Sequence, residues 1–308
     1  MILESKKRKL RSTYKRWRSR IKPQLKELRL SLYVIRKSPL ALVGLGIIAA
    51  FILLAMFGDL LAPYDPYMLN LPNRLQPPSF NHIFGTDELG RDVFSRVLSG
   101  AKYSIEIGII VLAVSIPLGS LLGAIAGYFG GIYDEVIMRA TDVFQAFPSL
   151  ILAMAISAAL GPSLQNVMVA LIVVWWPPYT RLVRATALSI RDYAYVEAAR
   201  SMGASNARII FQHILPNSIS PVIIRATLEM GAVIIWSAGL SFLGFGAQPP
   251  SPEWGRLITE GRLYIFQGWW ITTFPGVAIL LVVLGFNLLG DGLRDILDPK
   301  LRRVIEVK

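Results

Sequence analysis

The sequence predicts an all-α membrane protein with six membrane-spanning helices, and three observations support this fold class. Hydrophobic residues make up 54% of the 308 residues and charged residues only 17%, and the mean hydropathy is +0.51, more than a water-soluble surface allows. Uncharged windows of about 20 residues recur, and a helix of that length crosses a bilayer core of about 30 Å. The basic residues are also distributed unevenly, as a membrane topology requires.

The first predicted span is Leu40–Phe57, which lies in a charge-free window directly after a basic segment. Its length and the lack of a small-residue cleavage site favour an uncleaved anchor over a signal peptide. The first 37 residues carry 14 Lys+Arg and two acidic residues. We therefore expect 1–38 to be a basic cytosolic tail that contacts anionic lipid headgroups rather than nucleic acid, with a possible interfacial helix near Leu25–Lys37.

The other five spans are charge-free windows bounded by charged residues or by Gly and Pro. They are a helix from about Tyr103 to Gly130, two helices within Val143–Thr180 divided at Gly161, one within Met230–Pro252 entered from about Pro221, and one within Leu263–Gly290 whose apolar body starts near Trp269. The expected organisation is a first helix and extracellular loop at 39–102, a five-helix core at 103–290 with an inner loop at 181–220, and a cytosolic tail at 291–308.

The distribution of Lys and Arg predicts the orientation of these spans. With the N-terminal tail inside the cell, the inner segments carry 26 Lys+Arg and the outer segments carry six. This ratio fits the positive-inside rule, so both termini are expected in the cytosol.

Ionisable residues are nearly absent from the predicted spans. Lys102 and Glu106 open the second span, and Arg225 and Glu229 open the fifth, each at i,i+4 spacing where the two side chains of a pair can meet. We interpret both pairs as interfacial charges that reach the headgroup region. Carriers driven by ion gradients usually keep acidic groups near the midplane, so we expect the energy source to lie outside this chain.

Three glycines in the second span, Gly119, Gly123 and Gly127, recur every four residues. This spacing places them on one helix face and lets another backbone approach closely. Packing within the chain is the favoured interpretation, and a contact between subunits is the alternative.

Charged residues cluster in the predicted outer loop before the second span, at Asp87, Glu88, Arg91 and Asp92. A salt-bridged brace, with Arg91 or Arg96 as the basic partner of Asp87 or Asp92, is one interpretation. A contact with an external binding protein, or an outer gate, is the other.

Pairs and single tryptophans near the predicted span ends read first as an interfacial aromatic belt. They are Trp175, Trp176, Trp254, Trp269 and Trp270.

Several function classes lack the residues that they need. There is no cysteine and there are only two histidines, so thiolate metal sites and Ser-His-Asp catalysis are not expected. No Gly-Lys dipeptide occurs, so the chain has no Walker-A loop for ATP. We therefore expect no catalytic, metal or cofactor site in this chain.

The predicted inner loop between the fourth and fifth spans is too regular for a simple connection. Leu182–Met202 has no Pro or Gly and is expected to continue the fourth helix. Gly203 fits a left-handed turn after that helix. Ser205 or Asn206 can cap a short second helix that runs to about Ile214, and Pro216 is expected to end it.

The residues of this loop resemble a known motif. Glu197-Ala198-Ala199, three residues, Gly203, nine residues, and His213-Ile214-Leu215-Pro216 are similar to the EAA loop of ABC-importer permeases. His213 stands where the general pattern has Ile, and this departure resembles the oligopeptide/dipeptide/nickel branch. In that family the short helix, here with Ser205, Asn206 and Arg208, couples the membrane helices to the ATPases.

Further stretches resemble the C-type, or second, permease subunit of that branch, over about residues 30 to 303. Among them are Lys37–Gly44, Leu61–Pro66, Phe84–Asp92, Gly127–Gly131, Pro249–Gly255 and Gly290–Asp295.

The resemblance implies half of the translocation path of an ATP-driven importer of di- or oligopeptides in a prokaryotic cell membrane. It implies four partners: a homologous permease, two ATPases that bind ATP and magnesium, and an extracellular binding protein. An importer of oligosaccharides or nickel, and an ion-coupled secondary carrier, are the alternatives.

Overall fold

The computed structural model describes residues 38–297. The N-terminal basic tail with its expected interfacial helix, and residues 298–308 of the C-terminal tail, lie outside this range. The regular structure of the described residues is helical, with one isolated bridge between Thr86 and Asp92. The predicted all-α class is therefore confirmed for this part of the chain.

Ten α-helices and three shorter turns follow one another along the described chain. They are α2 (Pro39–Leu61), η1 (Leu71–Asn73), α3 (Val93–Phe129), α4 (Gly131–Ala146), α5 (Ser149–Leu160), α6 (Leu164–Ile190), α7 (Ala194–Ser201), α8 (Asn206–Ile209), the π-helical turn η2 (Ile210–Ile214), α9 (Leu215–Phe242), α10 (Trp254–Gly261), η3 (Arg262–Tyr264) and α11 (Trp270–Leu297).

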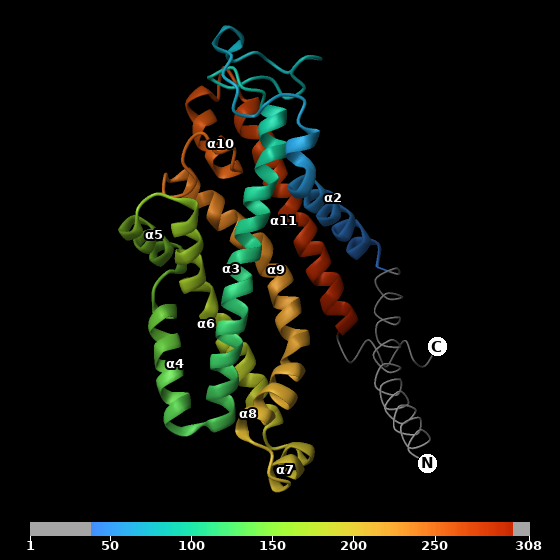
Figure 1. Ribbon diagram of the computed structural model, residues 1–308, viewed down its shortest axis with the longest axis vertical. Coiled ribbons are helices and arrows are strands. Elements are labelled where there is room, and N and C mark those ends of the chain that lie inside the picture. Colours follow the sequence, from blue (N-terminus) through green and yellow to red (C-terminus); the bar gives the residue numbers. More distant parts are fainter. Residues whose placement is uncertain (1–37, 298–308) are drawn as a thin grey trace, which may run out of the picture.

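Helix α3 lies at the centre of an elongated bundle (Figure 1). It packs against α6 and α9 and, through its first half, against α2, while α11 packs against α2 and α9. The loop that joins α2 to α3 and helix α10 lie together at one end, which we call the loop end. Helices α7 and α8 lie at the opposite end, which we call the hairpin end (Figure 1).

Five helices of the described residues are long and apolar enough to cross a membrane, and α4 with α5 makes a sixth crossing if that bent pair counts as one. This agrees with the predicted number of spans. The prediction that the third span is a single helix starting at Val143, however, was wrong. The chain bends by 88° between α4 and α5, because the ring of Pro148 disfavours a helical conformation at Phe147, which is extended.

Two spans begin earlier than the sequence predicts. Helix α3 starts at Val93 instead of Tyr103, because the Asp92 carboxylate caps it by accepting from the Ser95 N–H. Helix α9 starts at Leu215 instead of near Pro221 or Met230. Charged residues after these starts are tolerated because the bundle supplies partners for several of them.

Consequently, the two i,i+4 pairs do not lie at helix ends as expected. Arg225 and Glu229 lie within α9, where Arg225 Nε donates to Glu229 Oε1 at 2.7 Å. Lys102 and Glu106 lie within α3, and Lys102 Nζ pairs with Asp59 Oδ2 of α2 at 2.5 Å. The expected Lys102–Glu106 pair is therefore wrong.

The aromatic-belt interpretation is wrong for four of the five tryptophans. Trp175, Trp176, Trp254 and Trp270 are buried. Trp254 Nε1 donates to the Val97 carbonyl and Trp270 Nε1 donates to the Thr86 carbonyl, so these two indoles join the loop end to the bundle. Trp269 is exposed, as an interfacial residue would be. Composition near a span end cannot distinguish a belt from a core position.

The glycine stripe of α3 faces α6. A Cβ atom on Gly119, Gly123 or Gly127 would lie 2.3–2.6 Å from the nearest atom of α6. These glycines therefore serve helix packing within the chain. The close approach also fixes α6 on α3 directly before α6 leads into the hairpin end.

Candidate functional site

The hairpin end is built from α7, α8 and η2, which we call the α7–α8 hairpin (residues 194–214). The expected single helix over Leu182–Met202 is wrong, because α6 ends at Ile190 and a three-residue turn separates it from α7. The Tyr193 carbonyl accepts from the N–H groups of Val196 and Glu197 and so starts α7. The first arm of the hairpin is thus a separate two-turn helix.

The turn of the hairpin is a Schellman motif centred on Gly203. Gly203 has φ +81°, and its N–H donates to the Arg200 carbonyl while the Ala204 N–H donates to the Ala199 carbonyl. This pattern satisfies the last carbonyls of α7 and requires a left-handed residue. The predicted turn at Gly203 is confirmed. Glycine is needed here for its backbone conformation and not for space, since a Cβ atom added at this position would have no neighbour within 4 Å.

Helix α8 begins where the sequence predicts. The Ser205 hydroxyl accepts from the Arg208 N–H at 3.3 Å, which makes Ser205 the cap, while Asn206 is the first helical residue. The expectation that Pro216 ends this helix is wrong. Pro216 lies in the first turn of α9, a position that tolerates the missing N–H, and the helix continues from Asn206 to Phe242.

The hairpin is anchored on the end of α3. The Tyr128 hydroxyl donates to Asn206 Oδ1 at 2.8 Å, and the Arg200 guanidinium lies 5.6 Å from the centre of the Tyr128 ring. Arg191 Nη1, in the turn before α7, donates to the Gly127 carbonyl at 3.2 Å. These contacts therefore link the arms of the hairpin to the last turn of α3 and to the start of the long helix.

The motif residues divide between the core and the surface. Ala199 is buried and His213 and Leu215 are half-buried, with the His213 ring 5.7 Å from the Tyr195 ring. The remaining motif residues of the site prediction are exposed: Glu197, Ala198, Gly203, Ser205, Asn206, Arg208 and Pro216.

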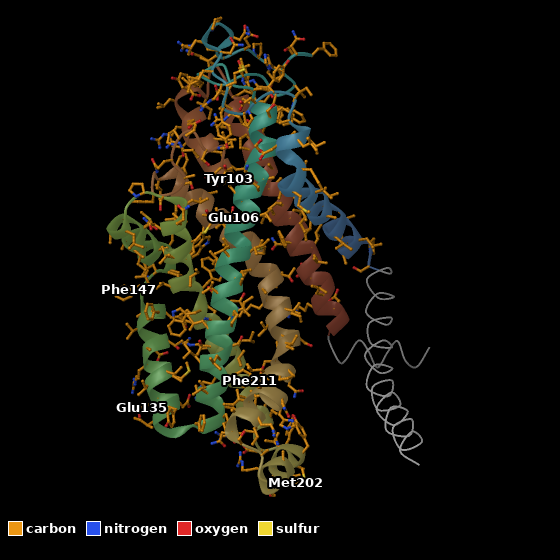
Figure 2. All side chains as sticks on the ribbon, viewed as in Figure 1. Tyr103, Glu106, Glu135, Phe147, Met202 and Phe211 are labelled. Atoms are coloured by element: carbon orange, nitrogen blue, oxygen red, sulfur yellow. The ribbon has the colours of Figure 1, made fainter. Side chains whose placement is uncertain are left out.

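Two exposed apolar side chains of the hairpin escaped the sequence prediction. Met202 is 83% exposed and Phe211 is 60% exposed, and both lie at the hairpin end (Figure 2). Ile209, Ile210 and Ile214, which lie on the same short helical segment as Phe211, are buried. Apolar residues on both faces of a short helix next to a turn glycine could have indicated a surface that another protein covers.

The outer charges form a buried network at the loop end. Asp87 Oδ2 accepts from Arg91 Nε and Arg96 Nη1, both at 2.6 Å. Glu260 of α10 accepts from the same two arginines at 2.9 Å. The bracing interpretation is confirmed for Asp87 with Arg91 and Arg96, and the network ties the loop to α3 and α10.

Glu88 and Asp92 flank this network. Glu88 Oε1 accepts from Arg91 at 3.1 Å, and burial followed by the nearby Asp87 charge raises the pKa of Glu88. Asp92 caps α3 and pairs through Oδ1 with His82 Nδ1 at 2.9 Å, not with an arginine. The carboxylates of Asp87, Glu88 and Glu260 lie close together, but the arginines between them supply the compensating charge.

The comparisons with known proteins agree with this architecture. Residues 119–303 match the family described as binding-protein-dependent transport system inner membrane component. Residues 28–78 match the N-terminal transmembrane domain of oligopeptide transport permease C.

Curated relatives cover nearly the whole chain. The probable D,D-dipeptide transport system permease of Escherichia coli (strain K12) is 49% identical over 268 residues, which is 87% of this chain and 90% of that protein. The di/tripeptide transport system permease of Pseudomonas aeruginosa (strain UCBPP-PA14) is 44% identical over 268 residues, 85% of this chain and 88% of that protein. A glutathione transport system permease of Escherichia coli O6:K15:H31 is 43% identical, with 87% and 88% covered.

Among solved structures, a chain of the MetNI methionine ABC transporter in inward-facing conformations has a TM-score of 0.53 and 20% identity, and covers 66% of this chain and 96% of that one. This similarity shows a shared fold. The resemblance noted in the sequence is therefore confirmed: the chain belongs to the binding-protein-dependent transport system inner membrane components, as a multi-pass permease subunit of the peptide-transport branch.

Proposed function

We propose that this chain forms half of the translocation path of an ATP-driven importer of di- or oligopeptides that an extracellular binding protein delivers. The family description supports the binding protein, and the names of relatives that transport dipeptides or D,D-dipeptides support the peptide cargo. The other half of the path comes from a homologous permease. ATP and magnesium are bound by two partner ATPases.

The hairpin end lies in the cytosol in this proposal, as do both termini. The excess of Lys and Arg in the segments assigned to the inside supports this orientation. The loop end with its buried charge network then faces the binding protein. The chain itself remains a transport subunit without a catalytic site.

The observation that carries the coupling step is the continuous helix from Asn206 to Phe242, 37 residues long. At 1.5 Å per residue it extends about 55 Å. Since α8 and α9 form one helix, a displacement of the hairpin by the ATPases passes directly into a membrane helix. The Tyr128–Asn206 bond passes the same displacement to α3.

The exposed residues of the hairpin form the contact with the ATPase. Met202 and Phe211 are the apolar residues that the ATPase covers, and Glu197 and Arg208 are charged residues on the same segment. Burying both apolar side chains stabilises the contact by about 1.5–3 kcal/mol each. Gly203 sets the angle between the two arms.

Replacing Gly203 with Val tests this proposal. A β-branched residue is strained at φ +81°, so the hairpin should change shape and uncouple ATP hydrolysis from uptake. Gly161→Val is the matched control, because Gly161 also has positive φ and open space but lies at the end of α5. Wild-type uptake by Gly203→Val at equal expression would contradict the coupling role.

Purification of the tagged chain tests the assembly. Extraction in mild detergent, identification of the bound chains by mass spectrometry and an ATPase assay should recover a second permease and ATPases with a Walker-A loop. A single chain without ATP hydrolysis, reproduced in several detergents, would favour an ion-coupled carrier instead.

A further inference from the structure

Three large apolar side chains are exposed on two turns of the loop end. Phe80 lies in the loop between α2 and α3, Leu263 lies in η3, and Phe266 follows η3. Phe80 is fully exposed, Phe266 is 99% exposed and Leu263 is 80% exposed. We call these three residues the outer apolar surface. Single exposed apolar residues are common on proteins, so their arrangement decides whether they form an interaction surface.

The turn with Phe80 and the turn with Phe266 start from the same contact. Gln76 and Thr86 close the first turn through two hydrogen bonds of 2.9 Å. Leu75 lies directly before this turn and packs against Gly268, which ends the second turn, since its Cδ2 atom would lie 3.3 Å from a Cβ atom added at Gly268. The exposed residues therefore belong to neighbouring turns, as in an interaction surface, and are not scattered single positions.

The turn that carries Phe80 is held on both sides of its tip. His82 Nδ1 pairs with Asp92 Oδ1 at 2.9 Å, and the Tyr64 hydroxyl donates to the Asn81 carbonyl at 2.9 Å. The backbone of Phe80 is thus fixed, although its own side chain is not packed against the protein. A preorganised turn of this kind lowers the entropy cost of binding a partner.

The outer apolar surface lies too far from the bilayer for lipid to cover it. From Pro39 to Asp59, helix α2 rises by about 30 Å, which is the thickness of the bilayer core. The pair of Asp59 with Lys102 therefore marks the outer edge of the hydrocarbon. Helix α3 starts about 14 Å further out than Lys102, whereas the headgroup layer is about 5–7 Å thick on each side. Asp92, which holds the turn of Phe80, caps this outer start of α3.

We propose that the outer apolar surface is the docking site of the extracellular binding protein. This inference rests on the proposed importer function, in which the loop end faces outwards. The family is described as binding-protein-dependent, and the loop that carries Phe80 is the outermost part of the loop end (Figure 1), where a protein that approaches from outside meets it first. Exposed aromatic residues on fixed backbone are typical anchors of protein interfaces. The acids and the arginine that were expected to make this contact, Asp87, Asp92 and Arg91, are buried and hold the loop in place instead.

The first test is Phe80→p-benzoylphenylalanine, a photoreactive substitution, in cells that take up radiolabelled alanyl-alanine through the complete transporter. Irradiation should link position 80 to an extracellular protein that binds alanyl-alanine once it is isolated. The same substitution at Phe57, an exposed aromatic residue of α2 within the membrane, is the matched control and should not give this product. A link from position 80 to the second permease, to a protein that binds no dipeptide or to lipid, or no link at all, would overturn the proposal.

The second test measures the affinity of the isolated binding protein for the complete transporter in lipid nanodiscs. Phe80→Ala should raise the Kd at least about tenfold, as the loss of an interface anchor does, and should leave the melting temperature unchanged, because the side chain packs against nothing in this chain. Phe57→Ala should keep the wild-type Kd. Equal Kd values for the two variants, or a lower melting temperature of Phe80→Ala, would overturn the docking role.

The two proposals fail in different ways. Absence of alanyl-alanine uptake by the transporter of unchanged sequence would contradict the proposed function. The photoproduct at position 80 would still show which molecule covers the outer apolar surface.

Discussion

Replacing Asp87 with Asn should open the loop end, because it removes one charge from a buried network without changing the size of the side chain. The Asp87 carboxylate is fully buried. Its Oδ2 atom accepts from Arg91 and Arg96, and its Oδ1 atom accepts from the backbone N–H groups of Leu89 and Arg91 at 2.9 Å. An asparagine has one acceptor oxygen, so either the two guanidinium groups or the two N–H groups lose their acceptor.

The expected cost follows from the charge balance of the network. The carboxylates of Asp87 and Glu260 face the guanidinium groups of Arg91 and Arg96, so the substitution leaves one buried positive charge in excess. Removing one partner of a buried ion pair costs about 3–5 kcal/mol. At 1.4 kcal/mol for each factor of ten, the equilibrium for opening the loop should rise by roughly a hundredfold to a few thousandfold.

Hydrogen–deuterium exchange of the segment 82–92 in the purified transporter measures this opening. Asp65→Asn is the control, since Asp65 is an exposed acid of the same loop. A second substitution, Arg96→Met, restores the charge balance, so the double variant should lose less protection than the sum of the single variants. Protection of segment 82–92 in Asp87→Asn equal to that in Asp65→Asn would refute the reasoning.

Two further predictions concern packing and pH. Gly123→Leu should lower the yield of folded protein and its melting temperature, because the Cβ atom would lie 2.3 Å from the Thr180 carbonyl oxygen. Gly46→Leu should be tolerated, because a Cβ atom at position 46 would have no neighbour within 4 Å. Equal melting temperatures of the two variants would contradict the packing role of Gly123. Burial raises the pKa of Glu88 above its ordinary value of 4.5, so its contribution to stability is complete below that value and decreases as the pH rises through the raised pKa. Glu88→Gln should therefore stabilise the protein relative to wild type at pH 7 and lose this advantage towards pH 4.5, and melting curves with a constant difference across that range would exclude this cause.

The sequence predicted features that depend on neighbouring residues. Ser205 and Gly203 were recognisable because a cap and a left-handed turn each require a specific residue type at one position. The membrane spans were recognisable because apolar length is sufficient to identify them. The predicted first and last residues of the spans were less accurate. A residue such as Asp92 or Pro216 can stand at the start of a helix or just after its end, and the sequence does not indicate which of these positions it occupies.

The charged residues mark the limit of sequence interpretation. Spacing alone paired Lys102 with Glu106, but the tertiary structure brings Asp59 of α2 to Lys102 and leaves Glu106 exposed. Spacing also paired Arg225 with Glu229, and there the structure agrees. An i,i+4 interval permits a contact, but competing partners from other helices decide whether it forms.

By itself, the sequence determined the helical membrane class, the family and the turn at Gly203 with the Ser205 cap, because hydrophobic length and local turn chemistry are properties of short segments. Only the tertiary structure decided the rest. It buried Trp254 and Trp270, joined α8 to α9 in one helix and assembled the network around Asp87 from three separate segments. The physical reason is that burial and ion pairing depend on distances between residues far apart in the chain, such as Arg96 and Glu260.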